Sequence, residues 1–361
     1  MTARTSDHGS TPAEDELRRA GAGYRVAVVG ATGQVGGVLL ELLTERGFPA
    51  SEIVPFASER SAGRVIGDGL VVQRLTDETI QGFDLALFSA GGGISREWSP
   101  RFAAAGAVVV DNSSAFRMDP AVPLVVSEVN PEDLEGHRGI VANPNCSTMQ
   151  MVVALRPIQR AVGIERLVVT TFQAVSGTGK GAVDTLHDQA ARVLAGEDAG
   201  DAGPYAHQIA FNALPQAGSF AEDDDHTDEE RKLINETRKI LGDDSIRVSP
   251  TCVRVPVVNG HSESVTVETR APLSAGDARE LLRNAPGVVV ADDPGGGSYP
   301  MAIDADGADP VYVGRIRQDP GHPQALSLWI VADNLRKGAA LNAVQLAEVL
   351  HERGFVGARV A

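Results

Sequence analysis

The chain has 361 residues, 43% of them hydrophobic and 22% charged, and a formal net charge of −16. This length suffices for two domains of ordinary size, whereas the negative charge argues against a nucleic-acid or anionic-membrane partner, because both need clustered basic residues. No run approaches the roughly 20 apolar residues of a membrane helix, and the two cysteines cannot build a disulfide framework, so we expect a reducing, cytoplasmic compartment.

A strand followed by a glycine turn is expected at the start of the folded chain. Residues 1–23 are polar and rich in Gly, Ser and Thr, so we predict a disordered tail without a signal peptide. An apolar run at 25–29 leads into Gly30-Ala-Thr-Gly33-Gln-Val-Gly36 and then a helical pattern. This is the dinucleotide-binding arrangement, in which a pyrophosphate lies on the helix N-terminus. A tight turn whose glycines serve packing alone is the alternative.

The turn after the next strand, at 53–57, bears on the choice of cofactor. A site that prefers NAD usually carries an acidic residue here, which bonds the ribose 2′-hydroxyl. This chain has Arg60 between Ser58 and Ser61, a set that suits a 2′-phosphate, so the sequence favours NADP. Glu59 weakens this interpretation, and a solvated turn is the alternative.

Three more strands are predicted in the first half of the chain, at 70–74, 85–89 and 107–111, with short helices between them. Strands that alternate with helices over 25–145 indicate a parallel, doubly wound sheet. Arg117 follows the third of these strands in a polar loop, where a guanidinium could hold an anionic substrate group. A surface arginine is the alternative.

Cys146 lies where a short strand and the turn Asn143-Pro144-Asn145 give way to a helical pattern. At a helix N-terminus, unpaired N–H groups and the helix dipole favour a thiolate over a thiol. The same N–H groups could hold an oxyanion. The alternative is an inert thiol in a core turn, as free cysteines usually are.

The second half of the chain predicts longer strands and a mixed or antiparallel sheet. We expect irregular chain at 195–228 and a glycine- and aspartate-rich loop at 292–310. Asn259-Gly260 is a tight-turn signal between two of the strands. The predicted strands are 167–174, 247–257, 262–270, 311–318 and 325–331, the last two paired, and the predicted helices are 183–194, 229–241, 274–284 and 341–351.

A nucleophilic cysteine beside a hydride acceptor indicates an enzyme that oxidises an aldehyde or reduces an acyl group. Such chemistry needs a base, and histidine is the usual one. Of the eight histidines, only His261 follows a tight turn beside a buried-looking strand that carries Arg254. A structural histidine is the alternative.

Eight motifs, in order from about residue 25 to 350, resemble those of the aspartate-semialdehyde dehydrogenase family. Their shape is most similar to that of bacterial members of the Gram-positive and actinobacterial type. The motifs are the glycine turn at 28–36, Ser89-Ala-Gly91, 111–117 with Arg117, 126–130, Asn143-Pro-Asn-Cys-Ser147, 173–177, 254–262 and 333–340.

The resemblance implies reversible, NADP-dependent conversion of aspartate semialdehyde and phosphate to aspartyl phosphate. The reaction would run reductively in the biosynthesis of lysine, through diaminopimelate, and of methionine, threonine and isoleucine. By similarity, Cys146 forms a thioester and His261 is the acid/base, with no metal. The implied substrate residues are Arg117, Asn145, Gln173, Glu229, Lys232 and Arg254; the implied cofactor residues are Gly30, Thr32, Gly33, Gln34, Val35, Arg60, Ser61, Ser176, Gly177 and Asn334. Independently of the resemblance, the three cations suit a substrate with two anionic groups.

The family also implies the domain organisation. An NADP-binding domain would comprise 24–146 and 334–361, and 147–333 would form an α+β domain for catalysis and dimerisation, in a homodimer or a homotetramer. The nearest alternative enzyme is N-acetyl-glutamyl-phosphate reductase, whose cysteine follows His-Pro-Gly rather than Asn-Pro-Asn. A catalytically silent NADP-sensing or scaffold protein is the alternative of another class. The tail at 1–23, the loop at 292–310 and Glu59 depart from the family pattern.

Overall fold

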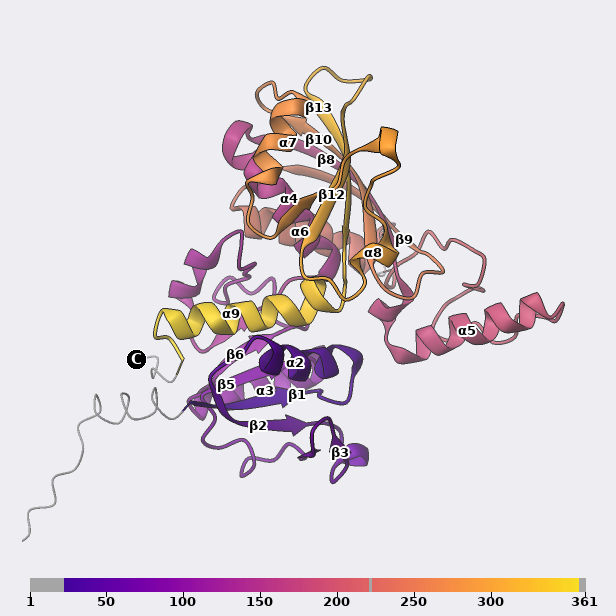
Figure 1. Ribbon diagram of the computed structural model, residues 1–361. Coiled ribbons are helices and arrows are strands. Elements are labelled where there is room, and N and C mark those ends of the chain that lie inside the picture. Colours follow the sequence, from indigo (N-terminus) through magenta and orange to yellow (C-terminus); the bar gives the residue numbers. More distant parts are fainter. Residues whose placement is uncertain (1–22, 221–222, 357–361) are drawn as a thin grey trace, which may run out of the picture.

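The computed structural model describes residues 23–220 and 223–356, arranged as two parts that are each built around a β-sheet (Figure 1). The predicted tail lies outside these residues except for Gly23, as do residues 357–361. Within the described residues, no helix is long and apolar enough to cross a membrane, and no three His, Cys, Asp or Glu side chains are grouped as metal ligands would be.

The first sheet is parallel throughout and is buried on both faces. Its strands form because they are nearly continuous apolar runs, as parallel strands covered on both faces require. Val28 and Leu87 pack with Leu39 and Val344 on one face, and Phe88 packs with Phe102 on the other. The strand order is β2 (Ala50–Phe56), β1 (Tyr24–Val29), β5 (Leu85–Phe88), β6 (Val108–Asp111) and β7 (Ile140–Ala142).

Helices on both faces make this sheet doubly wound, as predicted. Helix α2 (Gln34–Glu45) and the C-terminal helix α9 (Leu341–Glu352) cover one face, and α3 (Gly92–Ala104) covers the other (Figure 1). The chain therefore returns to its first sheet after building the second one.

The predicted strand at 70–74 is wrong as a member of the parallel sheet. Leu70–Val71 is extended there as β4 and pairs with β3 (Val65–Ile66) in a separate two-stranded hairpin, and Gln73 makes only a single parallel bridge to Phe56 of β2. The turn between them contains Gly67 and Gly69, both at positive φ, so local hairpin geometry overrides the apolar pattern.

The second sheet is mixed and has helices on one face. Its outer pairs, β11 with β12 and β8 with β9, are parallel, and the remaining pairs are antiparallel. The strand order is β11 (Val288–Val290), β12 (Val311–Gln318), β13 (Ala325–Ala332), β10 (His261–Thr269), β8 (Ile164–Gln173) and β9 (Arg247–Arg254). The main core packs this sheet against α4 (Cys146–Val162), α6 (Asp228–Leu241) and α7 (Ala275–Arg283).

The turn at Asn259-Gly260 does not join neighbouring strands, although the sequence predicts a tight turn between two of them. Strand β8 lies between β9 and β10 and pairs with both. The six residues after Arg254 cross the end of β8: the Val255 N–H donates to the Gln173 carbonyl, and the N–H groups of residues 175 and 176 donate to the carbonyls of residues 257 and 258. A turn motif in the sequence gives no sign that a strand from an earlier part of the chain lies between the two strands that the turn connects. The predicted pairing of β12 with β13 is confirmed.

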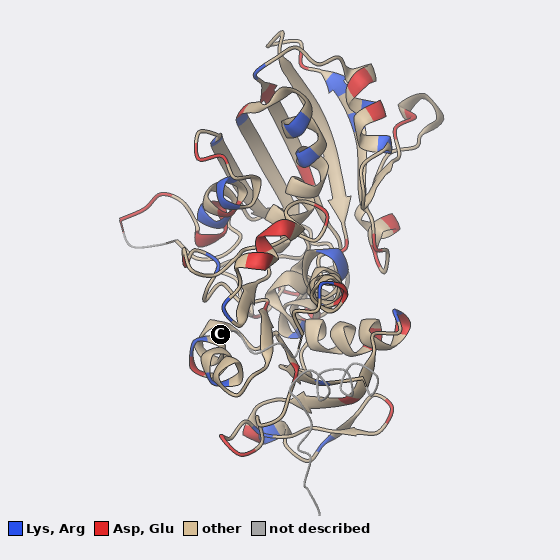
Figure 2. Cartoon of the chain, turned by 90° about the vertical axis from the view of Figure 1, so that its left-hand side faces the viewer, with Lys and Arg blue, Asp and Glu red and all other residues tan. Residues whose placement is uncertain are grey.

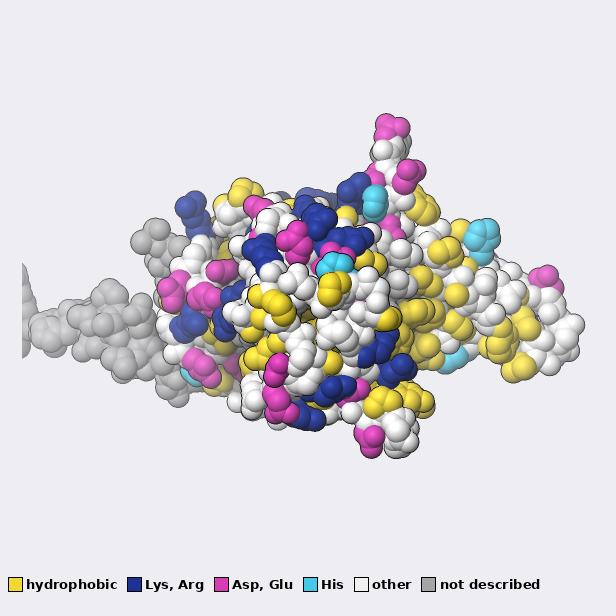
Figure 3. All heavy atoms as spheres, turned by 90° about the horizontal axis from the view of Figure 1, so that it is seen from above, with side chains coloured by type: hydrophobic (Ala, Val, Ile, Leu, Met, Phe, Trp, Pro, Cys, Tyr) yellow, Lys and Arg dark blue, Asp and Glu magenta, His cyan; other side chains and the backbone are white. Residues whose placement is uncertain are grey.

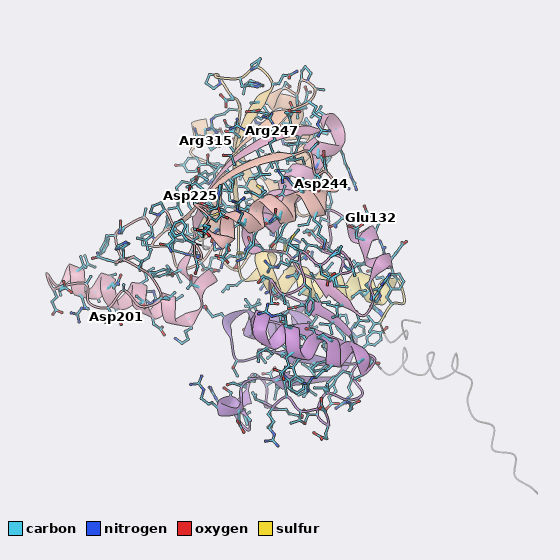
Figure 4. All side chains as sticks on the ribbon, turned by 180° about the vertical axis from the view of Figure 1, so that it is seen from behind. Glu132, Asp201, Asp225, Asp244, Arg247 and Arg315 are labelled. Atoms are coloured by element: carbon cyan, nitrogen blue, oxygen red, sulfur yellow. The ribbon has the colours of Figure 1, made fainter. Side chains whose placement is uncertain are left out.

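Shorter elements complete the fold, and helix α5 (Lys180–Leu194) forms an arm that projects sideways from both sheets (Figure 1). Figure 4 places Asp201 on this arm and Glu132 on the opposite side of the molecule. The sequence did not predict strand β11 or the π-helix η5. The short elements are η1 (Glu59–Ser61), η2 (Pro131–Gly136), η3 (Val175–Thr178), η4 (Pro294–Gly296), α8 (Ala302–Ala305) and η5 (Arg336–Ala340).

Charged side chains are spread over the outside of the molecule. Figure 2 shows them mainly on helices and loops, while the strands carry few. On the end of the molecule shown in Figure 3, Lys and Arg are interspersed with Asp and Glu. That face therefore presents no basic surface of the kind that binds nucleic acid.

Candidate active site

A cavity of about 920 Å³ lies where the two sheets meet. Loops that follow β1, β5, β6 and β7 line one side, and the ends of β8, β9 and β10 line the other. The carboxyl edge of a doubly wound sheet is the usual place for a ligand. Of the predicted site residues, the cavity is lined by Gly33, Gln34, Val35, Arg117, Asn145, Cys146, Gln173, Ser176, Gly177, Glu229, Lys232, Arg254, His261 and Asn334.

The glycine turn shapes the cavity end nearest α2. Gly30 has φ +89°, and a Cβ there would lie 2.3 Å from the Ser89 carbonyl oxygen. A Cβ on Gly36 would lie 2.2 Å from the Gly30 carbonyl oxygen, so only glycine lets the helix start so close to β1. Gly33 is the N-cap of α2 and supplies no side-chain cap. The first N–H groups of the helix are thus open to an anion, and the turn fits a dinucleotide pyrophosphate.

Four predicted cofactor residues do not line this cavity: Gly30, Thr32, Arg60 and Ser61. Gly30 acts through its backbone, as described above. Arg60 is exposed on η1, directly after β2. Glu59 on the same turn lies 4.0 Å from Arg74, so its carboxylate pairs with Arg74 and not with Arg60. The structure therefore leaves Arg60 accessible at the edge of the sheet.

Cys146 is the first residue of α4, and Asn145 is the N-cap, as the strand–turn–helix pattern predicts. The Asn145 Oδ1 accepts the N–H groups of Ser147 at 3.1 Å and Thr148 at 3.3 Å. These two N–H groups of the helix start consequently already have an acceptor. Gly338 of η5 packs directly on the cysteine, because a Cβ there would lie 2.8 Å from the Cys146 Cβ.

Burial opposes the electrostatic effect that the sequence predicts for Cys146. Desolvation, followed by the nearby Glu229 carboxylate, raises the pKa of its thiol to about 12. Arg254, Arg117 and the Ser147 N–H act in the opposite direction and are outweighed. The helix N-terminus is present, but burial and a neighbouring anion keep the group a thiol.

His261 begins β10 and is fully buried at the cavity wall. Its Nδ1 accepts the N–H of Ala174 at 3.0 Å, so the neutral ring carries its proton on Nε2. Nε2 has no hydrogen-bond partner among the described residues, and a Cβ on Gly177 would lie 3.3 Å from it. Burial, followed by the charge of Arg254, holds the pKa of His261 well below 6.5. The histidine is therefore a neutral donor that faces the cavity.

Arg254 ends β9 and forms no salt bridge within the described part of the chain. Its Nη1 donates to the Ala174 carbonyl at 2.7 Å, and its buried Nε has no partner there. Gln173 at the end of β8 donates to the Ser147 hydroxyl at 2.8 Å. The side chain of Arg254 thus has N–H groups to offer a carboxylate in the cavity.

Helix α6 presents Glu229 and Lys232 to this cavity and carries the buried Glu236 on the same face, since residues three, four and seven apart lie on one side of a helix. Lys232 Nζ lies 2.6 Å from Asp228 and 3.1 Å from Glu229. Burial alone would lower the pKa of Lys232, but these carboxylates outweigh it and raise the pKa. Burial would likewise raise the pKa of Glu229, yet Lys232 and a hydrogen bond from Asn145 lower it.

Two of the three cations that the sequence identifies already face a carboxylate of the protein, which the sequence did not show. Arg117 pairs with Glu236 at 3.1 Å, and Lys232 is held by two carboxylates. Glu236 is the buried site residue that the sequence reasoning missed. Its signal was its position seven residues after Glu229, which repeats the same helix face after two turns.

Ser176 and Asn334 hold the loops on the cavity's cofactor side together. Asn334 donates to the Ser176 hydroxyl at 2.8 Å and accepts the Gly260 N–H at 2.9 Å. The Ser176 hydroxyl donates to Asn259 at 2.9 Å. These bonds link η3, the turn before His261 and the segment that leads into η5, so they fix the wall between the two sheets.

Comparison with known proteins agrees with this arrangement. The family models described as the NAD binding domain and the dimerisation domain of semialdehyde dehydrogenase match residues 25–137 and 155–337. Aspartate-semialdehyde dehydrogenase of Aquifex aeolicus is 55% identical over 340 residues, which cover 92% of this chain and 100% of that protein.

Two solved structures show the same fold. The crystal structure of aspartate semialdehyde dehydrogenase II from Vibrio cholerae complexed with ASA is 48% identical, with a TM-score of 0.87 over 91% of this chain and 98% of that chain. The enzyme from Candida albicans with NADP is 26% identical, with a TM-score of 0.70 over 92% and 99%.

These matches span both sheets and leave little of the folded chain outside them. They do not favour N-acetyl-glutamyl-phosphate reductase, and they place an NAD(P)-binding domain before a dimerisation domain. The chain belongs to the aspartate-semialdehyde dehydrogenase family, phosphorylating oxidoreductases that act on an aldehyde in the aspartate pathway of amino-acid biosynthesis.

Proposed function

We propose that this chain reduces aspartyl phosphate to aspartate semialdehyde through a thioester on Cys146, with NADPH as the cofactor. The observation that carries the proposal is the meeting of Cys146, Arg254 and Glu229 in the cavity that the glycine turn also lines. Arg254 suits the substrate's carboxylate, and Glu229 suits its ammonium group. Arg117 and Lys232 line the same cavity and suit the phosphate.

The chemistry follows from these placements. The Cys146 Sγ attacks the acyl carbon of the substrate. The bond between that carbon and the phosphate oxygen breaks, and phosphate leaves with the bonding electrons. A nicotinamide cofactor held at the glycine turn with Gly33 would supply the hydride for the resulting thioester. The neutral His261 keeps its proton on Nε2 and can donate a hydrogen bond from there to the acyl oxygen as negative charge develops on it, until that oxyanion re-forms the carbonyl and expels the Cys146 thiolate. Breaking the carbon–sulfur bond releases the aldehyde and restores the cysteine.

Substrate binding also prepares the nucleophile. In the free protein the Glu229 carboxylate helps to keep Cys146 a thiol. An ammonium group placed beside Glu229 offsets that negative charge and lowers the pKa of the cysteine. Substrate binding thus shifts the equilibrium of Cys146 toward the thiolate. This gives Glu229 a role in activation as well as in recognition.

The function is tested by assaying aspartate semialdehyde and N-acetyl-glutamate semialdehyde side by side, each with phosphate and with NADP or NAD. We expect rapid, phosphate-dependent reduction of NADP with the first substrate alone. A preference for the acylated substrate would contradict the roles given to Glu229 and Arg254, because an acylated amine carries no positive charge.

NADP rather than NAD is the expected cofactor because Arg60 is exposed at the end of β2 with Ser61 beside it. Replacing Arg60 by alanine should raise KM for NADP about tenfold, the cost of about one charge-assisted hydrogen bond. KM for NAD should stay the same. The matched control is Arg315→Ala, since Arg315 lies on the second sheet (Figure 4). Equal losses for both cofactors would reassign Arg60.

Arg254→Lys should weaken substrate binding, because a point charge replaces a guanidinium that can bond a carboxylate with two N–H groups. KM for aspartate semialdehyde should rise about tenfold or more, with a smaller change in kcat. Arg247→Lys is the matched control, on the exposed outer end of the same strand. An unchanged KM in the Arg254 variant would remove this residue from the substrate site.

The domain division and the dimer belong to the same proposal. Helix α9 and η5 pack with the first sheet, which supports a cofactor domain of 24–146 and 334–361 and a second domain of 147–333.

The face of the second sheet away from α4 carries two aromatic side chains. Phe172 and Trp329 pack there at a tilt, with their ring centroids 5.4 Å apart, and remain partly exposed. We infer that this face joins two copies, as the dimerisation-domain match supports, and sedimentation would show a dimer or a tetramer. Two free thiols, Cys146 and Cys252, support a reducing, cytoplasmic setting.

A further inference from the structure

Glu236 is a buried carboxylate that lies against the N-terminus of the helix carrying Cys146. It is 1% exposed, on the face of α6 that packs toward α4. One oxygen accepts the backbone N–H of Asn145 at 2.7 Å, and the other accepts from Arg117 Nη1 at 3.1 Å. A buried carboxylate of this kind needs strong partners, and both of its partners belong to the cavity.

The two partners connect Glu236 to the nucleophile and to the ends of two strands. Asn145 is the N-cap of α4 and directly precedes Cys146, so its position sets where the helix begins. Arg117 also donates from Nε to the Asn143 carbonyl at 2.9 Å and from Nη2 to the Asn112 carbonyl at 2.9 Å. These carbonyls follow β7 and β6 directly. One carboxylate thus ties the second domain's helix to the carboxyl edge of the first sheet.

Arg117 keeps donors for a ligand while it is held in this way. A guanidinium has five N–H bonds, and three of them are used by Glu236, Asn143 and Asn112. Two N–H bonds remain on a side chain that lines the cavity. The pairing with Glu236 therefore orients Arg117 and still leaves two of its N–H bonds for a ligand.

We propose that Glu236 is a positioning residue for the reaction: it fixes Cys146 through the Asn145 N–H and orients Arg117 toward the phosphate site. The second half of this statement rests on the proposed phosphate site. The first half requires only that Cys146 is the nucleophile.

The charge of Glu236 matters because both partners are donors. A glutamine has one acceptor oxygen, so one of the two donors must face its NH₂ group. The oxygen should stay with the Arg117 cation, since charge-assisted bonds are stronger. The NH₂ group then faces the Asn145 N–H and displaces the start of α4. Glu236→Gln should consequently move Cys146 more than it moves Arg117.

The test compares Glu236→Gln with Glu230→Gln in the full-length protein. Glu230 is a matched control because it is buried on the same helix and also accepts two N–H groups, from Thr227 at 2.9 Å and Cys252 at 3.0 Å. It touches neither Asn145 nor Arg117. The kcat of Glu236→Gln should fall about 10- to 100-fold, as small misplacements of reacting groups do. KM for NADP and for phosphate should change by less than about threefold.

Rescue by a carboxylate separates positioning from general stability. Glu236→Asp keeps both acceptor oxygens and the charge, so its kcat should lie above that of Glu236→Gln. This variant also serves if the glutamine variant does not fold. Equal kcat losses in Glu236→Gln and Glu230→Gln, or an aspartate variant no better than the glutamine one, would overturn the inference. An inactive parent enzyme would instead overturn the proposed function.

Discussion

Replacing Cys146 by alanine is expected to abolish the phosphate-dependent reduction of NADP by aspartate semialdehyde. The loss should be about 10⁴-fold or more, the scale seen when a covalent nucleophile is removed. No other thiol can take over, because Cys252 is fully buried on β9 and burial raises the pKa of its thiol. The rate is measured as NADPH absorbance under saturating phosphate.

The alanine variant also tests whether the loss is chemical. Alanine is small and apolar, so Gly338, which packs on the Cys146 Cβ, still has its contact. The helix cap is made by Asn145 and does not use the thiol. NADP affinity, measured by fluorescence titration, should therefore match the parent. Turnover at the parent's rate in this variant would exclude the thioester mechanism.

Local patterns in the sequence were sufficient to predict the parallel sheet and most of the helices. Its strands are apolar runs punctuated by glycine turns, and neighbouring strands pair in parallel, with α2 between β1 and β2 and α3 between β5 and β6. Sequence patterns could not predict that β8 lies between β9 and β10, because the paired residues of β8 and β9 are 81 positions apart in the chain. The hairpin of β3 and β4 was missed because two short extended pairs around glycines do not produce a periodic pattern.

The site shows a similar division between residue types and their partners. Glycines, the cysteine at a helix start and the cations could all be identified from the sequence, and the structure brings most of them to one cavity. The sequence did not show which groups these residues contact in the folded protein. Glu236 neutralises Arg117, and Asn145 occupies the N–H groups expected to hold an oxyanion. The pKa of Cys146 depends on desolvation and on Glu229, which are both tertiary effects.

His261→Asn is expected to lower kcat by about 10²- to 10⁴-fold, the range for losing a proton-transfer group. An asparagine oxygen can replace Nδ1 as the acceptor for the Ala174 N–H, which His261 accepts at 3.0 Å. It places no donor where Nε2 faces the cavity. The change therefore removes the cavity-facing N–H and keeps the bond that orients the side chain.

His261→Gln is the matched variant, since its longer side chain can bring an amide N–H near the position of Nε2. It should recover part of the lost kcat if the histidine acts as a neutral donor. A loss below about tenfold in the asparagine variant would instead demote His261 to a structural role.

The pH dependence of stability gives a second, independent measurement on His261. Burial and Arg254 hold its pKa in the folded protein well below 6.5, so the unfolded chain binds a proton there before the folded one does. Stability therefore falls as pH drops below about 6.5, the unfolded value. Denaturant unfolding from pH 7.5 to 5 should show a smaller loss for His261→Asn than for the parent, because the variant has no such proton to bind. An identical pH dependence in both would mean that His261 takes up a proton as readily in the folded protein as in the unfolded chain. A protonated ring carries a hydrogen on Nδ1, so Nδ1 could then no longer accept the Ala174 N–H.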